Sequence, residues 1–236
     1  MKKSLNLYAG IGGNRKKWNG TKVTAVEMNT QIADVYRQQY PADDVVIGDA
    51  HKYLIEHYRE FDFIWSSPPC QTHSRMAKGT RHQNRKYPDM ALYQEVIFLQ
   101  HFFKGLWVVE NVKPYYEPLI QPTAVIGRHY FWANFEIAPF DISNHPNFIK
   151  SATSAETESL KAWLGIDYPG NIYYDGNHDP GQVLRNCVHP SLGEHVFLCA
   201  QHRLHMDAGD SAAQRALSQP VILSTAEAGT TPALRQ

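Results

Sequence analysis

The feature that most constrains the fold is an alternation of short apolar runs with longer helical segments between Ser4 and Glu110. The apolar runs are rich in β-branched and aromatic residues, a composition typical of buried strands. The segments between them repeat apolar residues about every 3.6 positions, as amphipathic helices do. This alternation predicts βαβ units and an α/β fold with a doubly wound, mostly parallel sheet.

The boundaries of the expected elements follow from these runs. The expected strands are Leu5–Tyr8, Lys22–Glu27, Val45–Ile47, Phe61–Trp65 and Leu106–Glu110, and the expected helices are Asn29–Tyr40, His51–Tyr58 and Met90–Lys104. In such a sheet, ligands bind beyond the carboxyl ends of the strands. Candidate functional residues are therefore sought where each strand ends.

The pattern changes after Pro122. Two further strands, expected to be antiparallel, cover Arg128–Phe135 and Glu136–Phe140, and helices are expected near Ala155–Leu164 and over Val183–Ala200. Residues 201–236 hold few large apolar side chains. We expect them to form a disordered tail.

Composition excludes several classes of protein. The 236 residues carry 23 Lys and Arg against 23 Asp and Glu, so bulk positive charge does not drive binding to nucleic acid, although a local basic patch remains possible. Three cysteines without a Cys-x-x-Cys pair indicate a reducing compartment and no structural zinc. The chain shows neither a signal peptide nor a long apolar span, so we expect a soluble cytoplasmic protein.

A glycine-rich loop, Tyr8-Ala9-Gly10-Ile11-Gly12-Gly13, closes the first expected strand. Such a loop is often only a connection, but glycines also let the backbone approach a ligand closely. Glu27 ends the second strand, at a spacing where a carboxylate accepts hydrogen bonds from a ribose, and Asp49 follows the third. The three strand ends together favour a cofactor that contains adenosine.

Cys70 follows Pro68 and Pro69 directly after a buried strand. An isolated cysteine is usually a small buried apolar residue, but the two prolines fix its position at the mouth of the sheet. No acidic residue lies between Asp62 and Asp89, and positive charge near the thiol would favour the nucleophilic thiolate. A run of charge is usually a solvated surface; here its position beside a candidate nucleophile favours phosphate contacts. The basic residues of this segment are Arg75, Lys78, Arg81, Arg85 and Lys86.

Glu110 ends the fifth expected strand. A carboxylate at the end of a buried strand is partly desolvated, which suits a proton donor. The alternative is a carboxylate that only caps a nearby loop. Because parallel strands end at the same edge, we expect Glu110 to lie close to Cys70.

Together these segments resemble the DNA C5-cytosine methyltransferase family, in the order in which the family carries its motifs. The residues of the resemblance are Tyr8-Ala9-Gly10-Ile11-Gly12-Gly13, Glu27-Met28-Asn29, Gly48-Asp49-Ala50, Pro69-Cys70-Gln71, Glu110-Asn111-Val112 and the segment 184–192. The family implies the Rossmann-like fold of the class I S-adenosylmethionine-dependent methyltransferases. It also implies DNA methylation of the kind found in restriction-modification systems.

The resemblance implies a chemical role for each motif. Cys70 would add to C6 of cytosine, Glu110 would protonate or hydrogen-bond N3, and the target base would be flipped out of the duplex. S-adenosylmethionine would be bound by Tyr8, Gly10, Ile11, Gly12, Glu27, Met28, Asp49, Ala50, Pro69, Asn186 and Val188. DNA would be bound by Gln71, Arg75, Lys78, Arg81, Arg85 and Lys86.

The chain departs from the family pattern in its second half. The family's eighth motif offers two arginines, whereas this chain has Arg128 alone, which we assign to the cytosine O2 with His129 as the substitute. Arg185 stands where glycine is usual. Only about 48 residues (Phe135–Gln182) remain for target recognition, and the candidates to read base edges there are Asn144, His145, Asn147, Asn171 and Asn177.

The positions of these motifs divide the chain into four parts. Residues 1–134 form the catalytic and cofactor-binding domain, 135–181 a reduced target-recognition region, 182–200 a helix that returns to the catalytic domain, and 201–236 the tail. We expect a monomeric enzyme, bacterial or phage-encoded in a bacterial host, that acts on double-stranded DNA without a metal or a membrane.

Two alternatives remain open. One branch of the family methylates transfer RNA, but it carries a Cys-Phe-Thr signature that this sequence lacks. A non-catalytic relative could instead retain the fold and bind DNA or S-adenosylmethionine. The presence of Cys70, Glu110, Glu27 and Asp49 in one chain argues against such a loss of activity.

Overall fold

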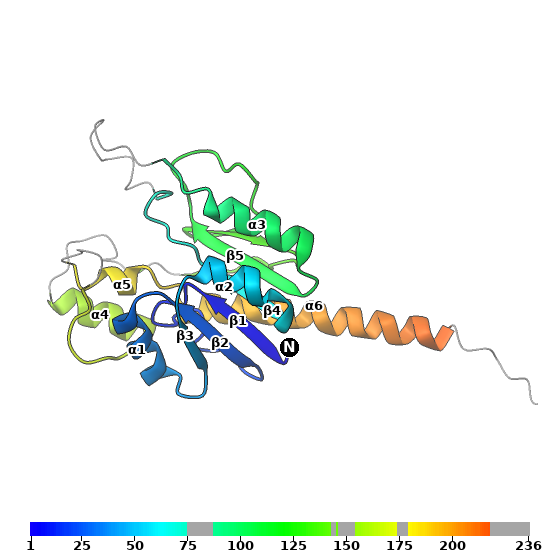
Figure 1. Ribbon diagram of the computed structural model, residues 1–236, viewed down its shortest axis with the longest axis horizontal. Helices are drawn as coiled ribbons and strands as arrows, with labels where there is room; N and C mark the ends of the chain where they lie inside the picture. Colours follow the sequence, from blue (N-terminus) through cyan, green and yellow to red (C-terminus); the bar gives the residue numbers. More distant parts are fainter. Residues whose placement is uncertain (75–86, 143–144, 146–153, 174–178, 218–236) are drawn as a thin grey trace, which may run out of the picture.

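The computed structural model describes residues 1–74, 87–142, 145, 154–173 and 179–217. Its sheet has seven strands in the order β3-β2-β1-β4-β5-β7-β6 (Figure 1). In chain order the strands are β1 (Lys3–Leu7), β2 (Lys22–Glu27), β3 (Asp44–Ile47), β4 (Phe63–Ser66), β5 (Leu106–Val112), β6 (Ala124–Ile126) and β7 (His129–Ala133). The helices are α1 (Thr30–Gln39), α2 (Ala50–His57), the short 3-10 helix η1 (Tyr58–Glu60), α3 (Ala91–Phe102), α4 (Ser154–Leu164), α5 (Gln182–Arg185) and α6 (Pro190–Leu217).

The order of the strands confirms the predicted doubly wound sheet. Strands β1 to β5 pair in parallel, and β7 pairs antiparallel with both β5 and β6. The chain runs outward from β1 to β3 and then returns to form β4 on the other side of β1. The direction of winding therefore reverses between β1 and β4, which is where α/β sheets open a crevice for ligands.

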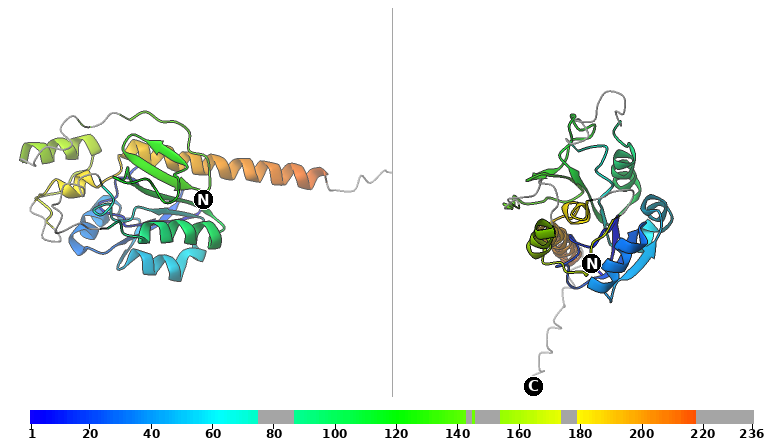
Figure 2. Two further views of the ribbon diagram at one scale, coloured as in Figure 1. Left: turned by 90° about the horizontal axis from the view of Figure 1, so that it is seen from above. Right: turned by 90° about the vertical axis from the view of Figure 1, so that its left-hand side faces the viewer.

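Helices cover both faces of the sheet (Figures 1 and 2). On one face, Leu54 of α2 and Leu99 of α3 pack against Leu5 and Leu7 of β1. On the other face, residues of α6 pack with Trp18, Phe63 and Trp65. Helix α1 lies on this second face, because its Tyr36 packs with Ala25 of β2. Burial of both faces explains why the strands read as continuous apolar runs.

Helices α1 and α2 each begin with a side-chain cap. The side chain of Asn29 accepts hydrogen bonds from the backbone N–H groups of Gln31 and Ile32 at the start of α1. The side chain of Asp49 accepts from Lys52 at the start of α2. Both residues therefore act as N-caps, which satisfy N–H groups that have no partner within the helix.

The sequence did not predict the hairpin formed by β6 and β7. Ile126 pairs with His129, so Gly127 and Arg128 form a two-residue turn. Gly127 has a φ of 56°, a backbone conformation that glycine adopts without strain. Arg128 therefore lies in the turn of the hairpin, and not within a strand as predicted.

Three other expectations for the second half were wrong. Glu136–Phe140 is irregular, and Pro139 in it lacks a backbone donor for a strand. The helix expected over Val183–Ala200 is interrupted before Pro190, because a proline disfavours helical geometry in the residue before it. Helix α6 then continues to Leu217, well past Ala200.

The continuation of α6 replaces the first half of the predicted tail. The segment from Gln201 to Leu217 contains several good helix formers and no proline. Figures 1 and 2 show this part of α6 extending beyond the sheet. Residues 218–236 lie outside the described residues. Among the helices that the structure describes, none combines the length and the apolar character needed to cross a membrane.

Candidate active site

A cavity of about 380 Å³ opens at the carboxyl ends of β1, β4 and β5. Its size suits a small-molecule ligand. The cavity brings together the glycine-rich loop, the Cys70 loop, the end of β5, the β6–β7 turn and the start of the C-terminal segment. Its lining includes Tyr8, Gly10, Glu27, Met28, Cys70, Gln71, Glu110, Arg128, His129, Arg185 and Asn186.

Glu27 fixes the glycine-rich loop through backbone contacts. One carboxylate oxygen accepts a hydrogen bond from the N–H of Gly10 at 2.9 Å, and the other accepts from the N–H of Asn29 at 2.9 Å. Gly10 has a φ of 55° and open space where a side chain would begin. The loop therefore presents bare backbone to the cavity beside an oriented carboxylate.

Gly12 packs against two aromatic rings behind this loop. It has a φ of 81°, and a Cβ atom there would lie 2.2 Å from Cε2 of Tyr40 and 2.9 Å from Cε2 of Tyr36. The hydroxyl of Tyr40 donates to the carbonyl of Gly12 at 2.7 Å. Both the backbone conformation and the close contact therefore require glycine at this position.

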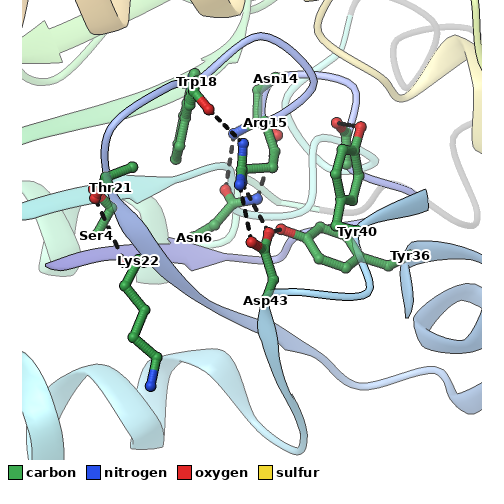
Figure 3. A network of polar contacts seen from close by, with 11 residues as sticks. Ser4, Asn6, Asn14, Arg15, Trp18, Thr21, Lys22, Tyr36, Tyr40 and Asp43 are labelled. Carbon is green, nitrogen blue, oxygen red and sulfur yellow. Dashed lines mark hydrogen bonds and ion pairs between the residues drawn. The ribbon is translucent and has the colours of Figure 1, made fainter. Parts of the chain in front are cut away.

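An ion pair behind the loop ties its far end to the start of β3 (Figure 3). Nε and Nη2 of Arg15 donate to the two carboxylate oxygens of Asp43 at 2.8 and 2.9 Å. The hydroxyl of Tyr36 donates to the same carboxylate at 2.9 Å. The side chains of Arg15 and Asp43 are only 13% and 3% exposed, so this is a buried, bidentate pair.

The structure places eight of the eleven predicted cofactor residues in the wall of the cavity: Tyr8, Gly10, Glu27, Met28, Ala50, Pro69, Asn186 and Val188. The other three lie elsewhere. Ile11 is fully buried among apolar residues, Gly12 faces the two tyrosines, and Asp49 caps α2. These three residues support the shape of the site from outside its wall.

The Cys70 loop is attached to the end of β5. The hydroxyl of Ser67 donates to Oε2 of Glu110 at 2.9 Å, and Nδ2 of Asn111 donates to the carbonyl of Pro68 at 2.9 Å. Because Ser66 pairs with Val109, the next residue on each strand meets across the sheet edge. The structure thus brings Cys70 and Glu110 into one cavity, as the sequence predicted.

Among the described residues, Cys70 is affected by burial and by two charged neighbours, Glu110 and Arg128. Burial raises the pKa of the Cys70 thiol, the charge of Glu110 raises it further, and Arg128 partly offsets the shift. All five basic residues of the loop lie outside the described residues: Arg75, Lys78, Arg81, Arg85 and Lys86. Gln71 is exposed next to Cys70.

His129 contacts Glu110. Nδ1 of His129 lies 2.6 Å from Oε1 of Glu110, and both side chains are 7% exposed. Nη2 of Arg128 donates to the carbonyl of Arg185 at 2.8 Å and to that of Cys187 at 3.4 Å. The turn thus joins the end of β5 to the end of α5 and the segment after it, with His129 on the carboxylate of Glu110 and Arg128 on the backbone carbonyls.

The candidate recognition residues are described only in part. His145 is buried and its Nε2 lies 2.9 Å from the hydroxyl of Ser159, while Nδ2 of Asn171 donates to the hydroxyl of Tyr173 at 3.3 Å. Asn144, Asn147 and Asn177 lie outside the described residues. Across the described ranges, no group of three His, Cys, Asp or Glu residues is placed to hold a metal ion.

The sequence analysis missed three residues that shape the site. Ser67 and Asn111 join the Cys70 loop to the end of β5 by hydrogen bonds. Glu95 is a fully buried carboxylate on α3. A signal for Glu95 was present, since an acidic residue stands in the apolar stripe formed by Leu92, Val96 and Leu99. Ser67 stands close to the Pro69-Cys70-Gln71 motif and Asn111 lies within the Glu110-Asn111-Val112 motif, but the sequence carries no further signal for their contacts.

Comparison with known proteins agrees with this geometry. Residues 2–117 match the family model of the C-5 cytosine-specific DNA methylases. A tRNA (cytosine(38)-C(5))-methyltransferase of Spodoptera frugiperda is 32% identical over 83 residues, which are 32% of this chain and 25% of that protein. The type II methyltransferase M.HgiBI of Herpetosiphon aurantiacus is 30% identical over 118 residues, 48% of this chain and 26% of that protein.

A crystal structure of a Spodoptera frugiperda DNMT2 mutant is also similar, with 25% identity and a TM-score of 0.36 over 48% of this chain and 36% of that one. The chain spans only about a quarter of the length of the two curated relatives described above. The matched residues nevertheless include the glycine-rich loop, Glu27, Cys70 and Glu110. Residues 2–117 therefore form a domain that matches the C-5 cytosine-specific DNA methylases.

Proposed function

We propose that this protein transfers a methyl group from S-adenosylmethionine to C5 of cytosine in double-stranded DNA. The observation that carries the proposal is one cavity that holds Cys70, Glu110 and the glycine-rich loop together. A nucleophile, a carboxylate and a cofactor loop at the same edge of an α/β sheet are the parts that such a reaction needs. The match of residues 2–117 to the methylase family supports it.

The residues of the cavity fit S-adenosylmethionine. The open backbone at Gly10 leaves room for a ligand, and the oriented carboxylate of Glu27 is suited to accept from ribose hydroxyls. Met28, which is 66% exposed, would pack on the adenine, and Asn186 and Val188 would border the methionine part. When bound, S-adenosylmethionine supplies an electrophilic methyl group.

The chain's own residues would activate the cytosine. Cys70 would add through its sulfur to C6, while Glu110 would give or share a proton at N3, which makes C5 nucleophilic. Once C5 carries the methyl group, loss of the C5 proton and elimination of the Cys70 sulfur from C6 would restore the aromatic ring and free the enzyme. Ser67 and His129 hold the two oxygens of Glu110 and so fix its direction. A base in a duplex is out of reach of a partly buried thiol in a cavity, so the target cytosine would be flipped into the cavity.

Transfer RNA is the second candidate substrate. It is favoured by the similarity to tRNA (cytosine(38)-C(5))-methyltransferases of Spodoptera frugiperda and Homo sapiens. DNA is favoured by the description of the matching family, by the similarity to M.HgiBI and by the absence of the Cys-Phe-Thr signature from the sequence. We therefore place DNA first.

One experiment tests the proposal and separates these substrates. The protein is incubated with tritiated S-adenosylmethionine and either duplex DNA or transfer RNA, and the nucleic acid is digested to identify the labelled base. We expect label in 5-methylcytosine of DNA, and no label with Cys70→Ser. As a control, Cys199→Ser alters a partly buried cysteine of α6 that lies outside the wall of the cavity and should retain activity.

Each other result has a clear meaning. Label in transfer RNA alone would replace the first substrate by the second. Absence of label from both, by a folded protein that binds neither nucleic acid nor S-adenosylmethionine, would refute the proposal. Label that persists in Cys70→Ser would exclude the covalent route through Cys70.

A further inference from the structure

Glu95 is a fully buried carboxylate that the proposed reaction does not use. Its Oε1 accepts a hydrogen bond from the hydroxyl of Tyr8 at 2.6 Å, and its Oε2 accepts from the hydroxyl of Ser66 at 2.5 Å. Nδ1 of His51 lies 3.1 Å from Oε1. A buried carboxylate is stable only with such partners, so this set of contacts compensates its desolvation.

The three partners come from three different strand ends. Tyr8 opens the glycine-rich loop after β1, Ser66 is the last residue of β4, and His51 lies in the first turn of α2 after β3. Tyr8 also lines the cavity and has a φ of 54°, which is unusual for a residue other than glycine. Glu95 therefore binds both the start of the glycine-rich loop and the end of the strand that leads to the Cys70 loop.

The path from Glu95 to the reacting groups is short. Ser66 is followed by Ser67, whose hydroxyl contacts both Nε1 of Trp65 and Oε2 of Glu110. On the other side, Tyr8 is two residues from Gly10, which binds Glu27. A shift of the Glu95 carboxylate would thus move the backbone on both sides of the cavity.

We propose that Glu95 is a positioning residue that holds both the glycine-rich loop, for binding of S-adenosylmethionine, and the Cys70 loop, for attack on the base. This inference rests on the proposed function. Tyr8 donates to one oxygen of the carboxylate and Ser66 to the other, so a single buried side chain fixes a strand end on each side of the cavity.

The pKa shifts of the groups around Glu95 favour their protonated forms, which can donate hydrogen bonds to its carboxylate. Burial, and then the charge of Glu95, raise the pKa of the Tyr8 phenol, so Tyr8 remains a donor. The hydrogen bond to Glu95 raises the pKa of His51. Asp49 and Asp89 also act on both groups, and in the same direction.

The test uses variants of the full chain that remove the contacts of Glu95 with Tyr8 and with Ser66 separately. Tyr8→Phe removes the first donor, Ser66→Ala removes the second, and Glu95→Gln replaces one acceptor oxygen by an amide donor. Ser4→Ala is the matched control, since Ser4 is a buried serine of β1 whose hydroxyl lies 2.7 Å from that of Thr21, at the other end of the strand.

Two quantities are measured for each variant. The first is the dissociation constant of S-adenosylhomocysteine, by calorimetry. The second is the rate of covalent trapping at saturating S-adenosylmethionine by duplex DNA, or by transfer RNA, in which 5-fluorocytosine replaces cytosine. Fluorine at C5 prevents the elimination that would release Cys70, so the Cys70–C6 bond persists and can be counted.

We expect Tyr8→Phe to weaken binding of S-adenosylhomocysteine about tenfold and to leave the trapping rate within about twofold. Ser66→Ala should show the opposite pattern. Glu95→Gln should change both quantities about tenfold or more, and the double variant Tyr8→Phe with Ser66→Ala should reproduce it. Ser4→Ala should change neither.

The inference is overturned if a folded Glu95→Gln protein binds and traps like the unmodified chain. It is also overturned if both quantities fall in every variant, the control included, in proportion to lost thermal stability, because that pattern indicates general destabilisation. If the unmodified chain neither binds S-adenosylhomocysteine nor is trapped, the proposed function fails and the inference fails with it. If the unmodified chain methylates normally and Glu95→Gln changes neither binding nor trapping, the inference is refuted and the proposed function stands.

Discussion

The two loops that face the cavity are held in different ways. The glycine-rich loop after β1 is fixed mainly through its backbone and from behind, by Glu27, Tyr40 and the Arg15–Asp43 pair. The Cys70 loop after β4 is fixed by Ser67, which binds the candidate acid Glu110 itself. Changes behind the first loop should therefore cost stability, whereas changes in the second should cost rate.

The largest expected effect is on rate, at Glu110, the carboxylate that Ser67 of the second loop binds. Glu110→Gln removes the proton donor but keeps the size of the side chain, so methyl transfer should fall by about 10²–10⁴-fold. The free energy of unfolding should change by only about 1 kcal/mol, because Ser67 and His129 can still bind the amide. Tritium incorporation and urea unfolding measure the two quantities.

Glu117→Gln is the control for this prediction. Glu117 is an exposed carboxylate seven residues beyond Glu110, and its replacement should leave both quantities unchanged. An equal loss of rate in the two variants would show that the effect of Glu110→Gln does not depend on its place in the cavity.

The next effect is on stability, behind the first loop. Asp43→Ala leaves the guanidinium of Arg15 buried without its carboxylate, which should lower the free energy of unfolding by about 3–5 kcal/mol. Asp44→Ala breaks an ion pair with Lys22 whose side chains are 59% and 64% exposed, and should cost about 0.5 kcal/mol or less. Chemical denaturation of both variants measures the difference, and similar losses would contradict it.

A smaller loss of stability is expected at Gly12. Gly12→Ala combines an unfavourable φ with a clash against Tyr36 and Tyr40, and should cost about 3 kcal/mol. Gly20→Ala shares the positive φ, 72°, but meets no atom within 4 Å, so it should cost about 1 kcal/mol. If urea unfolding gives the same loss of unfolding free energy for both variants, the contact of Gly12 with the two tyrosines does not contribute to stability.

The smallest effect concerns the charge state of Cys70. Because burial and Glu110 raise the pKa of its thiol, the thiolate fraction at neutral pH is lower than for an exposed cysteine. Alkylation of Cys70 by iodoacetamide, followed by peptide mass spectrometry, should therefore still accelerate as the pH rises above 9. Arg128→Met should shift this rise to higher pH, since Arg128 lowers the pKa; a shift to lower pH would contradict the assigned environment.

Much of the first half of the fold followed from local pattern. The bounds of β2 were predicted as found, and β1, β3, β4, β5 and helices α1 to α3 differ by a few residues at their ends. These elements have clear periodicity and side-chain caps such as Asn29 and Asp49. The second half was predicted less well, because it has short elements whose limits depend on tertiary partners.

The candidate site divides in the same way. Cys70, Glu110 and Glu27 were found because each follows a buried strand, and parallel strands end at a common edge. The roles of Arg128 and His129 were not predictable, because a one-residue difference in the position of a hairpin turn decides which side chain faces Glu110. Their assignment required the register of β6 and β7.

The sequence by itself determined the class of fold, the order of its first five strands along the chain and the residue types that line the cavity. Periodicity, caps and turn residues act within a few positions, so they are visible in one dimension. Only the tertiary structure decided that His129 binds Glu110, that burial raises the pKa of Cys70, and that Glu95 joins two loops. These features depend on distances between residues far apart in the chain, which packing of the sheet and its helices sets.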